Sequence, residues 1–319
     1  MTDAGSPSSR RSSSVGSPLG GLPFTHPDNF LGISDRDAAF EPADVVILPA
    51  PYEGTVSYGH GTSRGPRAIL DASRFVELYD HELDREPYAI GVHTLPALDL
   101  PKSGPESALA ELRRAYDRLL ATGKFPIVLG GEHAISGPLI EAWVDRLGEG
   151  RLTVLQLDAH ADLRAEWEGT PLSHACVMHR VHRRVRLVQA GIRAVTADER
   201  ALMRRADITA IFAHELDAAG AWIARAIDAT GPDVYVTIDV DYFDPALVPS
   251  TGTPEPGGGQ WYPTLDLLKR VFTERTVHAV DVVELAPLPG LQAPDFLVAK
   301  LVYKLVGFRA LARERAEAL

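Results

Sequence analysis

The sequence predicts an α/β fold of three layers (α/β/α), in which helices cover both faces of a mostly parallel central sheet. From about Asp44, short apolar and β-branched runs alternate with stretches whose apolar residues recur every three or four positions, the spacing of one helical face. The apolar runs are continuous rather than alternating, which is typical of parallel strands buried on both faces. No break in composition divides the chain after residue 40, so we expect one folded domain.

The expected strands are the apolar runs. In chain order they are Val45–Leu48, Ile127–Leu129, Leu152–Leu157, Val185–Gln189, Ile208–Phe212, Val234–Val240 and Val277–Val283. Helical spacing is clearest in Pro105–Thr122, where Pro105 suits a first turn and Gly123 suits the end of the helix. The same spacing appears over 265–272 and again over 297–308.

The beginning of the chain has a different composition. We expect residues 1–30 to form a flexible tail rich in Ser, Gly and Pro, because such a segment buries too little apolar surface to offset its ordering entropy. Residues 31–319 would form the single domain. A secretory signal would need an apolar segment after Arg10 and Arg11, where three serines follow instead. An organelle presequence is the less favoured alternative, because Asp3 lies within the segment.

Composition excludes several classes of protein. A chain of 319 residues with 45% hydrophobic and 24% charged residues is neither disordered nor collagen-like. It has no run of about 18 apolar residues, so a membrane-spanning helix is not expected. The single cysteine, Cys176, excludes a disulfide scaffold. A net charge of −11 argues against nucleic acid as a partner and favours cationic ligands. We therefore expect a cytoplasmic protein without nucleic-acid or membrane partners.

Ionisable side chains lie at the ends of four of the expected strands or just after them. The four segments are Gly130-Gly131-Glu132-His133, Asp158-Ala159-His160-Ala161-Asp162, Asp239-Val240-Asp241-Tyr242-Phe243-Asp244-Pro245 and Asp281-Val282-Val283-Glu284. In open parallel sheets, functional groups lie just beyond the carboxyl ends of the strands, along one edge. We therefore expect these histidines and carboxylates to converge.

Such a convergence predicts a metal centre. Residues two apart on an extended segment point the same way, so Asp158 and His160 can aim at one point, as can Asp239 and Asp241. The candidate ligands are His133, Asp158, His160, Asp162, Asp239 and Asp241. Converging carboxylates repel one another unless cations neutralise them, and this set of nitrogen and oxygen donors suits Mn²⁺, Zn²⁺, Ni²⁺ or Co²⁺. Six ligands are more than one catalytic ion with an open coordination position needs. The number therefore favours two ions that share bridging carboxylates and activate a water molecule.

Taken singly, these residues have simpler interpretations. Each histidine could be a hydrogen-bonded structural residue, Glu284 could be an ordinary ion-pair partner, and Asp244-Pro245 is a common turn signal. The coincidence of all the segments at strand ends favours the metal centre. The spacing of Gly59-x-Gly61-x-x-x-Gly65 does not match that of a dinucleotide-binding loop. Nothing marks Cys176 as a nucleophile.

These motifs resemble those of the ureohydrolases, the arginase and agmatinase family. The resemblance runs from about Pro49 to near the C-terminus and includes the signature from Pro51 to Gly65 and the glycine-rich loop from Thr251 to Gly258. It implies an arginase-like fold, a single catalytic domain over 31–319, and a homo-oligomer, either trimer or hexamer. It also implies two Mn²⁺ ions, with Ni²⁺ or Co²⁺ as alternatives.

By position, the resemblance assigns both the ligands and the catalytic groups. One ion would be held by His133, Asp158, Asp162 and Asp239, and the other by Asp158, His160, Asp239 and Asp241. Glu284 matches the carboxylate that pairs with the substrate guanidinium, and His174 matches a proton-shuttling histidine for which the nearby His179 and His182 are alternatives. A bridging hydroxide would attack the guanidinium carbon, and Asp162 would pass the proton to the departing amine.

For the substrate, the resemblance favours agmatine, which would give putrescine and urea. Aminopropyl-agmatine, guanidinobutyrate and arginine are alternatives. Glu166 or Glu168 could attract a terminal ammonium, or both could be solvated loop charges. His60 and Gly259-Gln260 depart from the family pattern, so the resemblance does not determine which substrate tail is bound. A binuclear metallophosphatase or a non-catalytic metal-binding protein are the rival classes. Phosphate substrates call for basic residues beside the metals, and Arg164 alone flanks the clusters.

Overall fold

The computed structural model describes residues 27–217 and 220–317. Most of the tail expected over residues 1–30 therefore lies outside the described residues. Asn29 and Phe30, at the end of that span, are buried, and Phe30 belongs to the hydrophobic core. No helix in the described part of the chain is both long enough and apolar enough to cross a membrane.

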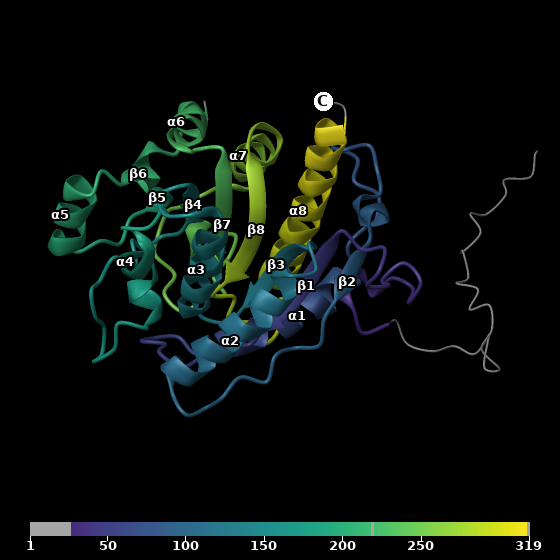
Figure 1. Cartoon of the computed structure of the whole chain (residues 1–319), viewed down its shortest axis with the longest axis horizontal. Helices are drawn as coiled ribbons and strands as arrows, with labels where there is room; N and C mark the ends of the chain where they lie inside the picture. Colours follow the sequence, from purple (N-terminus) through teal and green to yellow (C-terminus); the bar gives the residue numbers. More distant parts are fainter. Residues whose placement is uncertain (1–26, 218–219, 318–319) are drawn as a thin grey trace, which may run out of the picture.

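The centre of the molecule is an eight-stranded parallel sheet (Figure 1). Its strands are β1 (Val45–Ala50), β2 (Val92–Thr94), β3 (Phe125–Gly130), β4 (Leu152–Leu157), β5 (Arg186–Ile192), β6 (Thr209–Phe212), β7 (Asp233–Asp239) and β8 (Thr276–Val283). They lie in the order β2-β1-β3-β8-β7-β4-β5-β6. All seven expected strands are present, and β2 is an additional edge strand.

Helices surround this sheet. They are α1 (Gly65–Ser73), α2 (Pro105–Leu120), α3 (Ser136–Leu147), α4 (Val177–Val181), α5 (Ala197–Arg205), α6 (Ala221–Ala229), α7 (Trp261–Glu274) and α8 (Ala293–Glu317). The predicted helix from Pro105 ends at Leu120, and the two other predicted helical stretches lie within α7 and α8.

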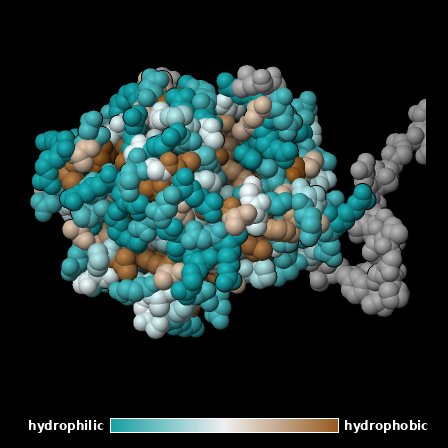
Figure 2. Space-filling view, in the orientation of Figure 1, coloured by the Kyte–Doolittle hydropathy of each residue, from teal (hydrophilic) through white to brown (hydrophobic). Residues whose placement is uncertain are grey.

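Two hydrophobic cores show that the sheet is covered on both faces. Side chains of α1, α6, α7 and α8 pack in one core, and side chains of α2, α3, α4 and α5 pack in the other. Alternate residues of one strand enter different cores, as for Val45 and Val46 of β1, because successive side chains of a strand point to opposite faces. This is the predicted three-layer fold. The outer surface seen in Figure 2 is mostly hydrophilic, with small hydrophobic groups between.

Candidate metal and substrate site

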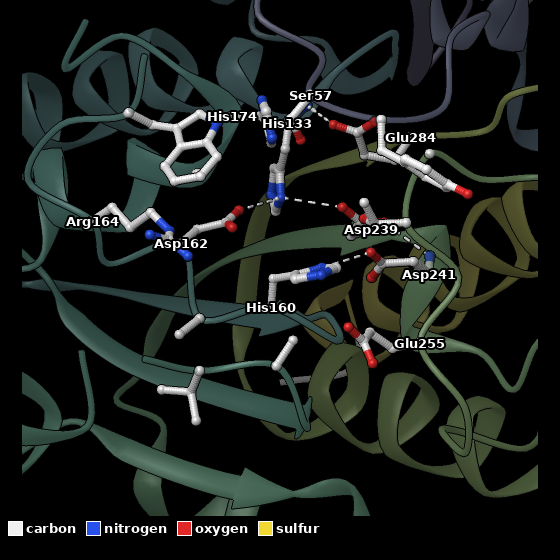
Figure 3. A pocket seen from close by; sticks show the side chains of 18 of the residues that line it. Ser57, His133, His160, Asp162, Arg164, His174, Asp239, Asp241, Glu255 and Glu284 are labelled. Carbon is white, nitrogen blue, oxygen red and sulfur yellow. Dashed lines mark hydrogen bonds and ion pairs between the residues drawn. The ribbon is translucent and has the colours of Figure 1, made fainter. Parts of the chain in front are cut away.

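A pocket of about 320 Å³ lies beyond the carboxyl ends of the strands, where the sequence predicts the site. Figure 3 shows that its side chains come from separate strand ends and point toward one another. Its lining includes His133, His160, Asp162, His174, Asp239, Asp241 and Glu284. Asp158 is fully buried beneath them. The structure thus brings together all the residues that the sequence analysis singled out as ligands or catalytic groups.

The first group of possible ligands surrounds His133. The Nδ1 atom of this buried histidine lies 3.1 Å from Oδ2 of Asp158, 3.0 Å from Oδ2 of Asp162 and 3.5 Å from Oδ2 of Asp239. Ligand atoms of His133, Asp158 and Asp239 all lie within 4.8 Å of one another, close enough to hold one metal ion. The same four residues form one of the ligand sets that the family resemblance implies.

The second group shares Asp158 with the first. Ligand atoms of Asp158, His160 and Asp241 lie within 4.8 Å of one another, and His160 Nδ1 is 2.8 Å from Oδ2 of Asp241. Asp241 is oriented by two main-chain contacts: its Oδ1 accepts from the amide of Ala159, and its own amide donates to Oδ1 of Asp239. Asp158 therefore lies between the two groups, as a bridging carboxylate must.

The orientation of His133 leaves its Nδ1 atom available to a cation. Nε2 of His133 lies 2.8 Å from the Thr237 hydroxyl, and that hydroxyl donates its proton to Asp281. The Thr237 oxygen therefore accepts from Nε2–H, which leaves the lone pair on Nδ1. This Nδ1 atom is buried, and no hydrogen bond satisfies it. An unsatisfied nitrogen facing three carboxylates fits a divalent cation.

The electrostatics of the cluster indicate a shortage of positive charge. Burial and the neighbouring Asp241 and Asp158 raise the pKa of Asp239 well above its usual value. Burial and Asp158 raise the pKa of Asp162 to about 7. Burial lowers the pKa of His160, but the charges of Asp241 and Asp158 outweigh it and raise this pKa to about 12. Protons are drawn in where cations are missing, so cations bound there would displace them.

Buried side-chain amides of two glutamines fix the position of Asp158, and the sequence analysis did not identify them. Nε2 of Gln156 donates to Oδ2 of Asp158 at 2.7 Å, and Nε2 of Gln189 donates to Oε1 of Gln156 at 2.6 Å. Both glutamines are fully buried on central strands. The polar side chains of Gln156 and Gln189 within mainly apolar strands were the sequence signal that could have identified these two residues.

Glu132 attaches the loop after β1 to the site. Its buried carboxylate accepts from the amides of Gly54 and Thr55 at 2.6 and 2.7 Å and from the Thr55 hydroxyl at 2.6 Å. The Thr55 hydroxyl in turn lies 3.3 Å from Nδ1 of His174 and accepts from the His174 amide. Glu132 is therefore satisfied within the protein, and it supports His174 through Thr55.

Of the three candidate histidines, His174 is the one that lines the pocket. Burial lowers the pKa of His174 to about 4, so its ring is neutral near pH 7. The rings of His179 and His182 face each other at a tilt of 48° instead, with centroids 5.1 Å apart, and neither histidine lines the pocket.

Glu284 and Asp162 have backbones in the left-handed region, with φ of 66° and 53°. Non-glycine residues seldom adopt this conformation, and such strain is concentrated at functional sites. Oε1 of Glu284 accepts from the His133 amide at 2.6 Å, and its other oxygen has no partner among the described residues. Burial and the charge of Glu132 raise the pKa of Glu284.

Among the described residues, the pocket lining has one basic side chain other than histidine, Arg164, whose guanidinium stacks on Trp167 at 4.3 Å. Glu255 lines this region, whereas Glu166 and Glu168 are exposed and lie outside the lining. Asp244 accepts from the Ala246 amide, as the turn interpretation predicts. Cys176 is buried outside the pocket, and burial raises its pKa to about 11.

Comparisons with known proteins agree with this geometry. The sequence matches the Arginase family over residues 43–307. An N(1)-aminopropylagmatine ureohydrolase of Synechocystis is 38% identical over 289 residues, which cover 88% of this chain and 94% of that protein. An agmatinase of Bacillus anthracis is 33% identical over 254 residues, which cover 78% and 86%.

A solved structure has the same fold. The agmatine ureohydrolase of Thermoplasma volcanium superposes with a TM-score of 0.80 at 26% sequence identity, and the match covers 91% of this chain and 97% of that one. The family match spans most of the chain, and the motifs at the strand ends lie inside it. The chain therefore belongs to the arginase family, as its sequence motifs predicted, and is a ureohydrolase of that family.

Proposed function

We propose that this protein hydrolyses the guanidinium group of a linear guanidine with a cationic tail, releasing urea and an amine. The observation that carries this proposal is the charge of the pocket. Six carboxylates line it: those of Asp162, Glu199, Asp239, Asp241, Glu255 and Glu284. The one arginine that the described residues contribute to the lining is stacked on a tryptophan. With the three aspartates assigned to bound cations, the three glutamates still leave the lining acidic. Such a lining attracts a cationic tail and repels the carboxylate tails of arginine and guanidinobutyrate.

Two substrates fit this description. The sequence motifs favour agmatine, but the Synechocystis relative, 38% identical with 94% of its length covered, is named for N(1)-aminopropylagmatine. The relative named agmatinase is 33% identical, with 86% of its length covered. N(1)-aminopropylagmatine is therefore the proposed preferred substrate, and agmatine is the second.

Two divalent cations fit the candidate ligands. One set would be His133, Asp158, Asp162 and Asp239, and the other Asp158, His160, Asp239 and Asp241. Manganese is the proposed ion, with Ni²⁺ or Co²⁺ as alternatives, because the donors are nitrogen and oxygen without a thiolate. Bound there, the ions would supply Lewis acidity and lower the pKa of a water.

The protein's own groups would position the substrate and move the protons. The free oxygen of Glu284 accepts an N–H of the guanidinium, because a carboxylate is a charge-assisted acceptor for that planar cation. As water attacks the guanidinium carbon, a C–O bond forms and Asp162 takes the released proton. Asp162 then passes the proton to the nitrogen whose C–N bond breaks. The neutral His174 ring exchanges protons between the amine and solvent.

A panel of substrates tests the proposal. Urea release is measured with N(1)-aminopropylagmatine, agmatine, guanidinobutyrate and arginine in the presence of Mn²⁺, beside a phosphate monoester. The proposal predicts a higher kcat/KM for the two substrates with cationic tails than for those with carboxylate tails, and no phosphate release. Urea from none of the guanidines, or phosphate release alone, would contradict it.

A further inference from the structure

One acidic side chain of the pocket has no hydrogen-bond or ion-pair partner in the described part of the chain. Glu255 is half-buried in the loop after β7 and lines the pocket, yet its carboxylate makes no hydrogen bond or ion pair with any described residue. The other lining glutamates are engaged: Glu199 accepts from Leu163 and Thr196, and Glu284 accepts from His133. Glu255 is therefore the pocket glutamate whose two oxygens are both available to a ligand.

The backbone of Glu255 is held firmly. The Arg193 guanidinium, just after β5, donates to the carbonyl oxygen of Glu255 from NH2 at 3.0 Å and from Nε at 3.3 Å. Pro254 and Pro256 flank Glu255 and restrict the chain on both sides. A carboxylate on such a rigid support binds a ligand with little loss of conformational entropy.

The same arginine joins this loop to the candidate metal site. Its guanidinium also donates to the carbonyl oxygens of Gly191, Asp241, Tyr242 and Phe243, at 3.1, 2.7, 3.4 and 3.3 Å. All its hydrogen-bond acceptors are main-chain carbonyls, so Arg193 forms no ion pair with Glu255 or Asp241 among the described residues. It instead fixes the distance between the Glu255 loop and the segment that carries Asp241.

Glu255 lies at the end of the pocket away from Glu284 (Figure 3). In Figure 3, Glu284 and Glu255 lie at opposite ends of a row in which Asp239 and Asp241 stand between them. A guanidinium placed at Glu284 would leave its carbon chain leading along this row. Agmatine and N(1)-aminopropylagmatine both carry a cationic nitrogen four methylene groups from the guanidine, so one carboxylate could serve either substrate.

On the basis of the proposed function, we infer that Glu255 determines substrate specificity by binding this cationic nitrogen. Arg193 is the residue that positions Glu255. A carboxylate without an internal partner accepts charge-assisted hydrogen bonds from an ammonium group. The exposed Glu166 and Glu168 lie outside the pocket lining and would have no such role.

The experiment compares agmatine with butylguanidine, which has the same carbon chain and no ammonium. In the wild-type protein kcat/KM is higher for agmatine. In Glu255→Gln the ratio of the two kcat/KM values falls about tenfold or more, mainly through the KM for agmatine, as expected when a uniform binding interaction is lost. Glu166→Gln is the matched control and keeps the wild-type ratio.

The possible outcomes distinguish a failure of the proposed function from a failure of the role of Glu255. A wild-type protein that releases no urea from agmatine, butylguanidine or N(1)-aminopropylagmatine rejects the proposed function and this inference with it. An active wild type whose ratio is unchanged in Glu255→Gln rejects the role of Glu255 alone. A ratio that falls equally in Glu166→Gln also rejects it, because a diffuse charge effect would then be sufficient.

A second pair of variants tests the positioning residue. Arg193→Lys keeps the charge but loses the planar set of donors that reaches several carbonyls, so the ratio falls in the direction seen for Glu255→Gln. Arg275→Lys is the control, because Arg275 also donates to carbonyl oxygens, those of Glu274 and Ile227, outside the pocket lining. An unchanged ratio in a folded Arg193→Lys protein, as judged by circular dichroism, rejects the role of Arg193. If that variant does not fold, Glu255→Gln remains decisive for the inference.

Discussion

The Thr237 hydroxyl accepts a hydrogen bond from Nε2 of His133 at 2.8 Å and donates one to Asp281 at 2.6 Å, and so determines which nitrogen of that ring carries the proton. Asp281 is fully buried and also accepts from the Tyr235 hydroxyl. This chain of polar groups passes through the core of the sheet behind the pocket. It keeps the Nδ1 atom of His133 directed at the three carboxylates.

Removing the hydroxyl should weaken metal binding. In Thr237→Val the His133 ring loses its acceptor, and loss of such a supporting contact lowers metal affinity about 10–100-fold. Titration of the metal-free protein with Mn²⁺ by calorimetry measures the change. Thr237→Ser keeps the hydroxyl and should bind as the wild type does. Equal affinities of the Val and Ser variants would show that Thr237 does not support His133.

The turn after β3 needs a glycine because the neighbouring loop touches it. A Cβ atom on Gly131 would lie 1.8 Å from the carbonyl oxygen of Tyr52, so the backbone itself would have to move. We expect Gly131→Ala to lower the free energy of unfolding by about 3 kcal/mol, as for severe overpacking. Urea denaturation measures this value.

Gly123 provides the comparison. It has nothing within 4 Å of a Cβ and a φ of 72°, so Gly123→Ala should cost only about 1–2 kcal/mol from the left-handed backbone. A Gly131 variant as stable as the Gly123 variant would contradict the steric explanation.

A buried ion pair predicts how stability depends on pH. Nζ of Lys304 in α8 lies 2.7 Å from Oδ2 of Asp80, and both side chains are buried. Burial opposes ionisation of Asp80, but the Lys304 ammonium outweighs it and holds the pKa of Asp80 below its usual value. A depressed carboxylate pKa stabilises the fold above the unfolded-state value, about 3.9, and this stabilisation is lost as the pH falls through the folded-state pKa.

Asp80→Asn should therefore lower the free energy of unfolding at pH 7 by about 3 kcal/mol, because the buried Lys304 ammonium then keeps only the more exposed Glu82, 3.2 Å away, as a carboxylate partner. The difference from the wild type should shrink below about pH 4. Chemical denaturation at several pH values measures it. Asp71→Asn removes an exposed pair with Arg67 and should change stability by less than about 1 kcal/mol. A difference for Asp80→Asn that stays constant down to pH 2 would contradict this account.

Cys176 should be unreactive in the folded protein. It is fully buried, and the raised pKa of about 11 leaves little thiolate at pH 7. Ellman's reagent should react with it only after denaturant unfolds the chain. Rapid reaction of one equivalent in native buffer would show that the thiol is accessible.

The strand ends and their ligands could be predicted from the sequence because each motif is local. Asp158 and His160 follow a continuous apolar run. Parallel strands bring their carboxyl ends to one edge of the sheet whatever the order of the strands. The short strand Val92–Thr94 was not predicted, because three residues show no usable period. The order of the strands depends on packing between distant segments and was not predictable from periodicity either.

The supporting residues could not be identified in the same way. In the sequence, Glu132 follows two glycines and precedes His133. Only the folded loop at Thr55 shows that the Glu132 carboxylate holds this loop and is not a metal ligand. Arg193 and Glu255 lie on segments far apart in the chain, and their contact exists only once β5 and the loop after β7 are placed side by side. The sequence motifs suggested Glu166 or Glu168 for the substrate tail, whereas Glu255 lines the pocket and those two residues do not.

The central claim is that two divalent ions on these strand ends make the protein a guanidine hydrolase. The most direct measurement is urea release from N(1)-aminopropylagmatine while Mn²⁺ is added stepwise to chelator-treated protein. We predict no urea from the metal-free protein and full activity once two ions per chain are bound. Full activity without metal, or none after two ions have bound, would contradict the claim.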